Sequence, residues 1–154
     1  MRNLRARISN TPQNTATPNS MKIKSAILIA DDDSDDCYLI QLAFKDCNID
    51  NPIVFFKNGL EVMQYIQKKS DNEIALIILD LNMPKMDGKI TLSKIKTNPS
   101  WKRVPVVVLT TSTSKQDIGD CYDSGANGFI SKPSSYDDLQ NVVKAMSKMW
   151  LSYE

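Results

Sequence analysis

The chain has 154 residues, of which 42% are hydrophobic and 24% charged, a balance that suits one globular domain able to bury a core. Nineteen Lys and Arg residues against eighteen Asp and Glu leave a formal charge of +1, so no overall field favours nucleic acid or an anionic membrane as a partner. The absence of histidine excludes Ser-His-Asp and Cys-His catalysis and removes the commonest metal ligand.

The cysteines and the N-terminal segment bear on location and domain organisation. Cys37, Cys47 and Cys121 are widely spaced and form no CxxC pair, which predicts free thiols in a reducing compartment, the cytoplasm. Residues 1–21 are rich in Asn, Thr, Ser, Pro and Arg and contain few apolar residues. We therefore expect a flexible tail or an over-extended start over residues 1–21, followed by a single domain over residues 22–154.

Short apolar runs alternate with helical patterns along that domain. The runs predict strands over residues 26–30, 53–56, 75–79, 104–109 and 128–130. Apolar residues recur at helical spacing after each run, with Ser34, Asn58, Ser114 and Ser135 as N-caps and Gly125 as a helix stop. Five apolar strands alternating with five helices predict an α/β fold with a parallel sheet covered on both faces. In such sheets the functional site lies beyond the carboxyl ends of the strands.

Polar residues follow four of the expected strands at that edge: Asp31, Asp32 and Asp33, then Asp80, Thr110 and Lys132. Clustered carboxylates repel one another unless a cation lies among them, and oxygen ligands favour Mg²⁺. A carboxylate beside Mg²⁺ can attack phosphorus, while a hydroxyl and a lysine bind the phosphoryl oxygens. Asp80 is the best candidate for the nucleophile because it is the lone carboxylate at the end of a central strand. Each feature alone is common in turns, so the prediction depends on their convergence.

Four segments resemble the receiver domain of two-component response regulators: ILIADDDSDD, IILDLNMPKMDG, VPVVVLTTS and GANGFISKP. They look most like single-domain regulators similar to those that partner bacterial phytochromes, and the resemblance extends from about Lys22 to about Leu151. It implies a flavodoxin-like, doubly wound (βα)5 fold with strand order 2-1-3-4-5. It also implies a phosphorelay protein that accepts a phosphoryl group from a histidine kinase or phosphotransfer protein, with Mg²⁺ as cofactor.

The resemblance assigns roles to individual residues. Asp80 would be the phosphoacceptor, Asp31 and Asp32 would hold the metal with Asp80, and the backbone carbonyl of Asn82 would also bind it. Thr110 and Lys132 would contact the phosphoryl group, and Thr110 and Phe129 would form the switch. The third acid, Asp33, leaves open which two of the three contact the metal. The family also implies a cis bond before Pro133.

Two other functions remain open at this point. A Mg²⁺-dependent aspartyl phosphohydrolase commonly has a second acid two residues after its nucleophile, where this chain has Asn82, which cannot act as a carboxylic acid. The other is a receiver that binds proteins without being phosphorylated. Under the main hypothesis the chain is not an enzyme beyond self-phosphorylation from phosphodonors and autodephosphorylation.

The expected output is a protein-interaction surface, because only a few residues follow the last expected helix. Met149, Leu151 and Tyr153 add apolar groups beyond the core stripe of that helix. We therefore expect a homodimer through the fourth helix, the fifth strand and the fifth helix, strengthened by phosphorylation.

Overall fold

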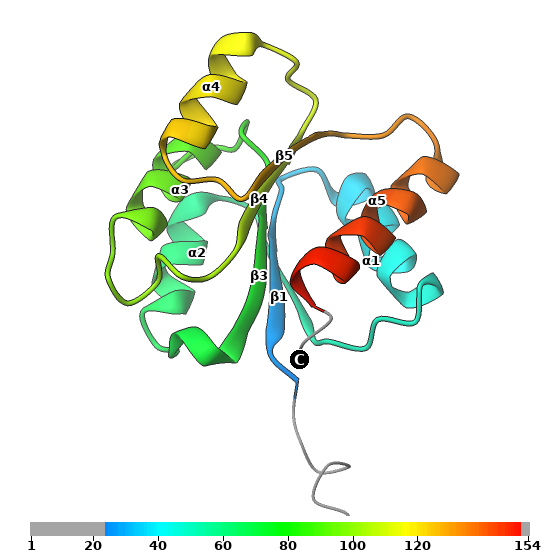
Figure 1. Ribbon diagram of the computed structural model, residues 1–154, viewed down its shortest axis with the longest axis horizontal. Coiled ribbons are helices and arrows are strands. Elements are labelled where there is room, and N and C mark those ends of the chain that lie inside the picture. Colours follow the sequence, from blue (N-terminus) through cyan, green and yellow to red (C-terminus); the bar gives the residue numbers. More distant parts are fainter. Residues whose placement is uncertain (1–23, 152–154) are drawn as a thin grey trace, which may run out of the picture.

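The computed structural model describes residues 24–151, in which five parallel strands alternate with five α-helices (Figure 1). The strands are β1 (Ala26–Ala30), β2 (Ile53–Phe56), β3 (Ile74–Leu79), β4 (Val106–Thr110) and β5 (Gly128–Ser131). The helices are α1 (Ser34–Asp46), α2 (Gly59–Ile66), α3 (Gly88–Lys96), α4 (Lys115–Asp123) and α5 (Tyr136–Trp150), and a short 3-10 turn, η2 (Asp71–Glu73), precedes β3. The tail predicted over residues 1–21 lies outside the described residues.

The strand order β2-β1-β3-β4-β5 confirms the predicted flavodoxin-like topology. All neighbouring strands are parallel, with Ala30 beside both Phe56 and Leu79, and Leu79 beside Val108. The carboxyl ends of these strands therefore lie at one edge of the sheet. The start of β4 differs from the prediction, because the strand begins at Val106 rather than at residue 104. Pro105 precedes it and has no N–H to donate, although its carbonyl accepts from the amide of Ile77 at 2.9 Å.

Helices cover both faces of the sheet, as the continuous apolar strands predict (Figure 1). Alternate strand residues face two separate apolar layers. One layer packs against α2 and α3 through side chains such as Val62, Ile66 and Leu92, and the other packs against α1 and α5 through Phe44, Val143 and Met146. All six residues of β3 are buried. This central strand, which ends at the candidate nucleophile, is therefore fixed from both sides.

The helix ends agree with most of the predicted caps. Asn58, Ser114 and Ser135 accept backbone N–H bonds as N-caps of α2, α4 and α5, and Gly125 has the positive φ of 100° that favours glycine. The prediction for α1 was wrong by one residue, because Asp33 rather than Ser34 is the N-cap. The Asp33 carboxylate accepts from the amides of Asp35 and Asp36, at 2.9 and 3.1 Å.

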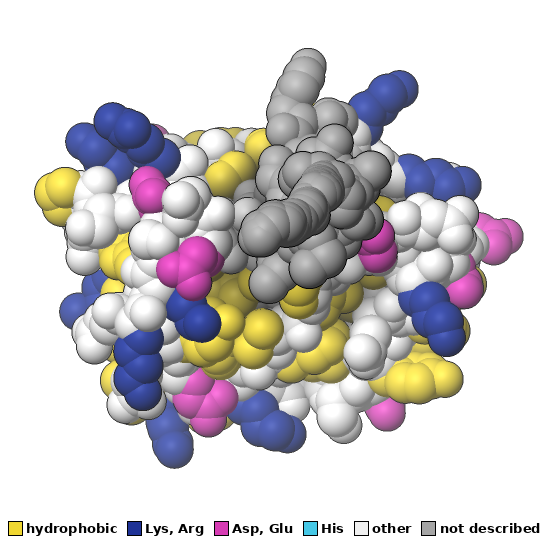
Figure 2. All heavy atoms as spheres, turned by 90° about the horizontal axis from the view of Figure 1, so that it is seen from below, with side chains coloured by type: hydrophobic (Ala, Val, Ile, Leu, Met, Phe, Trp, Pro, Cys, Tyr) yellow, Lys and Arg dark blue, Asp and Glu magenta, His cyan; other side chains and the backbone are white. Residues whose placement is uncertain are grey.

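The surface of the described residues carries both signs of charge. Figure 2 views the molecule from below, at the end opposite the carboxyl edge of the strands, and shows Lys and Arg side chains interspersed with Asp and Glu around the rim. Among the helices of residues 24–151, none combines the length and the hydropathy that a membrane crossing requires.

Candidate functional site

Four polar side chains lie at the carboxyl edge of the sheet, each fixed by the end of a different strand. Asp31 directly follows β1, Asp80 follows β3, Thr110 is the last residue of β4, and Lys132 follows β5. Asp31, Asp80 and Thr110 are buried, at 3%, 7% and 0% exposure. The structure thus brings together side chains that the sequence places up to about a hundred residues apart.

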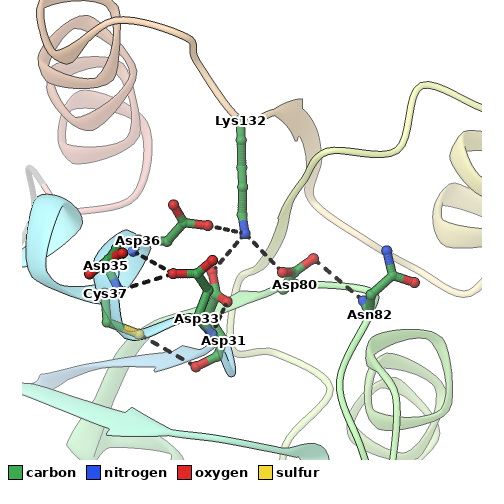
Figure 3. A network of polar contacts seen from close by, with 8 residues as sticks. All are labelled: Asp31, Asp33, Asp35, Asp36, Cys37, Asp80, Asn82 and Lys132. Atoms are coloured by element: carbon green, nitrogen blue, oxygen red, sulfur yellow. Dashed lines mark hydrogen bonds and ion pairs between the residues drawn. The ribbon is translucent and has the colours of Figure 1, made fainter.

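The Lys132 ammonium is the centre of the polar network at this edge (Figure 3). Its Nζ lies 2.8 Å from Oδ2 of Asp31, 2.7 Å from Oδ2 of Asp36 and 2.9 Å from Oδ2 of Asp80. Burial alone would lower the pKa of Lys132, but the hydrogen bonds to Asp31, Asp36 and Asp80 outweigh it and raise the pKa above its ordinary value. Lys132 therefore stays charged at neutral pH.

Asp31, Asp32 and Asp80 form a candidate metal centre. Each offers a carboxylate oxygen, and the three oxygens all lie within 4.8 Å of one another. Burial raises the pKa of Asp31, and the hydrogen bonds from Lys132 and from the Asp33 amide only partly offset this. The Lys132 ammonium contacts only two of these three carboxylates, Asp31 and Asp80, so the group keeps an excess of negative charge, and oxygen ligands of this kind suit a hard divalent cation. The donor set therefore fits a divalent metal ion.

Asp33 lies outside this group because the first turn of α1 uses its carboxylate as the N-cap. Its amide is nevertheless part of the site, since it donates to Oδ1 of Asp31 at 2.9 Å. The sequence left open which two of the three acids would contact a metal ion. This geometry favours Asp31 and Asp32.

Thr110 is a buried hydroxyl with no hydrogen-bond partner among the described residues. An unsatisfied buried polar group costs about 1–3 kcal/mol, so native proteins rarely keep one without a reason. The Thr110 carbonyl accepts from the Lys132 amide at 2.8 Å, so the two residues are joined through their backbones. An unpartnered donor at this edge fits an anionic ligand such as a phosphoryl group.

The loop after β3 folds back tightly against the end of the strand. The amide of Asn82 approaches Oδ1 of Asp80 at 3.4 Å, and the amide of Gly88 donates to the carbonyl of Leu81 at 2.9 Å. A Cβ on Gly88 would lie only 2.2 Å from the carbonyl oxygen of Asp80. Glycine is therefore required at position 88 because a side chain would not fit, and not because of a special φ. The residue with left-handed backbone in this loop is Lys85, at φ 64°.

Phe129 lies in β5, half-buried against the apolar layer on the α2 and α3 side. Its amide donates to the hydroxyl of Tyr122 at 3.2 Å, which links β5 to α4. The expected cis bond before Pro133 was wrong, because the described residues contain no cis peptide bond. An X–Pro bond favours trans by only about 0.5–1 kcal/mol, so proline permits either isomer without requiring one.

Two residues of the site were missed by sequence reasoning. Asp36 bonds Lys132 directly, and the thiol of Cys37 approaches the carbonyl of Asp31 at 3.4 Å. Burial, followed by the charges of Asp31 and Asp36, raises the pKa of Cys37 to about 11, so the thiol stays protonated at neutral pH. The sequence did offer one indication for Asp36: it lies in the first turn of the helix that directly follows the acidic cluster, and so close to the same edge of the sheet.

Comparison with known proteins identifies the family. Residues 27–144 match the response regulator receiver domain family. The chain belongs to this family. It is 37% identical over 129 residues to the response regulator Rcp1 of Synechocystis, covering 81% of this chain and 88% of that protein. It is 33% identical over 130 residues to the probable methanogenesis regulatory protein FilR2 of Methanothrix harundinacea, covering 82% and 84% of the two chains.

Solved receiver structures share the fold. The phosphorylated cyanobacterial phytochrome response regulator RcpA superposes with a TM-score of 0.77 at 36% identity, over 85% of this chain and 96% of that one. The Mn²⁺-bound form of Rcp1 gives a TM-score of 0.74 at 36% identity, over 83% and 95% of the two chains. Receiver domains bind a divalent metal in the active site and interact with histidine kinases or phosphotransfer proteins. The predicted family, fold and two-component function are thereby confirmed.

Proposed function

We propose that this receiver domain accepts a phosphoryl group on Asp80 from a histidine kinase or phosphotransfer protein. The observation that carries the proposal is the buried Asp80 carboxylate, which lies 2.9 Å from the Lys132 ammonium and within 4.8 Å of carboxylate oxygens of Asp31 and Asp32. An Asp80 oxygen attacks phosphorus, the P–N bond of the donor phosphohistidine breaks, and an acyl phosphate forms. Lys132 and the Thr110 hydroxyl bind oxygens of the transferred group.

Mg²⁺ is the cofactor that we propose for this reaction, held by Asp31, Asp32 and Asp80 with the backbone carbonyl of Asn82. When bound, the ion would neutralise the carboxylates and the phosphoryl charge. The chemistry of the chain would be limited to self-phosphorylation from phosphodonors and autodephosphorylation. We place the protein in the cytoplasm, in keeping with the free thiols of Cys37, Cys47 and Cys121.

Incubation with acetyl phosphate and Mg²⁺, followed by mass spectrometry, tests this function against both alternatives. A receiver should gain the mass of one phosphoryl group in an adduct that hydroxylamine removes. Continuous release of phosphate at many turnovers per protein would instead indicate an aspartyl phosphohydrolase. A protein that gains no adduct and releases no phosphate would be a binding module that works without phosphorylation.

Asp32→Ala is expected to weaken Mg²⁺ binding by about tenfold or more, because it removes one of three ligands from the acidic group. The exposed position of Asp32 means that the fold should tolerate the change. Mg²⁺ titration followed by NMR measures the effect. Asp35→Ala removes the same charge from the neighbouring helix turn and serves as the control. An unchanged titration in Asp32→Ala would transfer the role to Asp31 or Asp33.

Thr110→Ala is expected to uncouple phosphorylation from the structural response. The phosphoryl group brings a charge of roughly −1.5 to −2 at neutral pH and should draw in the unpartnered Thr110 hydroxyl, after which Phe129 fills the vacated space. The variant should still gain the adduct but lose the chemical-shift changes in β5 by NMR. Thr110→Ser keeps the hydroxyl and is the matched control. Full wild-type shifts in phosphorylated Thr110→Ala would show that this coupling is not used.

We further propose that phosphorylation strengthens a homodimer through α4, β5 and α5. Tyr122 on α4 and Met149 on α5 are exposed apolar side chains, at 50% and 64%. Of the apolar residues that the sequence suggested beside Met149, Leu151 is buried at 7% exposure and Tyr153 lies outside the described residues. Sedimentation with and without beryllofluoride, a phosphoryl mimic, should show a shift toward dimer. A monomer in both states at micromolar concentration would leave a different protein as the partner.

A further inference from the structure

Asp36 is the third carboxylate bonded to the Lys132 ammonium, and the proposed chemistry assigns it no role. An ammonium has three N–H donors, and Lys132 has three carboxylate acceptors within 2.9 Å, on Asp31, Asp36 and Asp80. Each donor can therefore point at a different carboxylate (Figure 3). The side chain of Lys132 is only 13% exposed, so water competes little for these donors.

The three carboxylates differ in what happens to them during phosphorylation. Asp31 and Asp80 belong to the group whose oxygens can hold a metal ion, and Asp36 does not. The Asp80 oxygen that bonds to phosphorus loses its negative charge and becomes a weaker acceptor. One donor of Lys132 is thereby released toward the phosphoryl group. Asp36 neither belongs to the metal group nor forms the acyl phosphate, so it remains available as an acceptor for Lys132 throughout the reaction.

The position of Asp36 is itself fixed. It lies in the first turn of α1, where its amide donates to the Asp33 cap at 3.1 Å, and its side chain is 35% exposed. Lys132 lies 96 residues further along the chain, in the loop between β5 and α5. The bond between them therefore joins that loop to α1, and it adds a restraint from α1 on a long, flexible side chain that Asp31 and Asp80 also hold.

We propose that Asp36 is a positioning residue that holds the Lys132 ammonium in place for phosphoryl transfer to Asp80. The inference rests on the proposed function, in which Lys132 binds the phosphoryl oxygens. Holding the ammonium before the donor arrives reduces the ordering that the reaction would otherwise require. Asp36 acts through Lys132 and touches no reacting atom.

The kinetic test compares Asp36→Ala with Asp35→Ala, using acetyl phosphate at saturating Mg²⁺ and mass spectrometry. Both variants lose one charge from the first turn of α1, but the exposed side chain of Asp35 is not among the partners of Lys132 in the described structure. We expect the phosphorylation rate constant of Asp36→Ala to fall about tenfold, and that of Asp35→Ala to change less than about twofold. A hydrogen bond to a charged group is strong enough for the larger effect. Asp36→Glu, which restores the carboxylate, should recover most of the rate.

A second measurement follows the ammonium itself in the metal-free, unphosphorylated protein. With ¹⁵N-labelled lysine, Lys132 should give an ammonium signal protected from hydrogen exchange in the wild type and in Asp35→Ala, and the protection should be reduced in Asp36→Ala, where only Asp31 and Asp80 remain as partners among the described residues. A wild-type rate in Asp36→Ala, an equal loss in Asp35→Ala, or unchanged protection would overturn the inference. A wild-type protein that forms no adduct would instead overturn the proposed function, while the ammonium signal would still report the contact.

Discussion

Asp80→Asn is expected to abolish phosphorylation by acetyl phosphate and to leave the fold intact. The substitution replaces the attacking carboxylate by an amide of nearly the same shape, so no acyl phosphate can form at residue 80. The Lys132 ammonium keeps Asp31 and Asp36 as partners, at 2.8 and 2.7 Å. The charge of Asp80 is one of the influences that raise the pKa of Asp31, so its removal also relieves repulsion within the acidic group.

The measurement is mass spectrometry of the intact protein, with unfolding in denaturant as the check on the fold. The variant should gain no phosphoryl mass and should unfold at the same or a higher denaturant concentration than the wild type. Asp35→Asn makes the same chemical change outside the site and should be phosphorylated normally. A hydroxylamine-sensitive adduct that persists in Asp80→Asn would show that a different residue is the phosphoacceptor.

Because its added Cβ would overlap backbone atoms, Gly88→Ala is expected to cost about 3 kcal/mol of unfolding free energy and to impair phosphorylation as well. The new Cβ would lie 2.2 Å from the Asp80 carbonyl oxygen and 2.8 Å from the Leu81 Cα. Both are backbone atoms just beyond the end of the fully buried strand β3, so they cannot move aside as a flexible side chain would. Relief of the clash must displace α3 or the end of β3, and the second movement would shift Asp80 away from Lys132.

Gly119→Ala is the matched control for this prediction. Gly119 lies in α4, where an added Cβ would meet no atom of the described part of the chain within 4 Å. Alanine is favoured over glycine in a helix by about 0.8–1 kcal/mol, so this variant should be slightly more stable than the wild type. Denaturant unfolding of both variants measures the contrast. If Gly88→Ala unfolds at the wild-type midpoint, the close approach of Gly88 to Asp80 does not constrain the loop.

The sequence by itself determined the fold class and the edge of the sheet that carries the site. Strand β1 and strand β2 have the predicted bounds because uninterrupted apolar runs between helical patterns leave few alternatives. The site could be located because parallel strands bring their carboxyl ends together, so a residue placed after a strand is placed in space as well. That rule brought Asp31, Asp80, Thr110 and Lys132 to one edge without any distance being known.

Only the tertiary structure decided which polar groups at that edge are bonded to one another. Asp33 follows Asp31 and Asp32 without a break, yet the α1 cap uses its carboxylate while its neighbours lie beside Asp80. Asp36 contacts Lys132 across 96 residues, and Thr110 keeps a buried hydroxyl that finds no partner within residues 24–151. Local patterns fix where the backbone turns, whereas these contacts depend on side-chain directions from elements far apart in the chain, which only the packed structure sets.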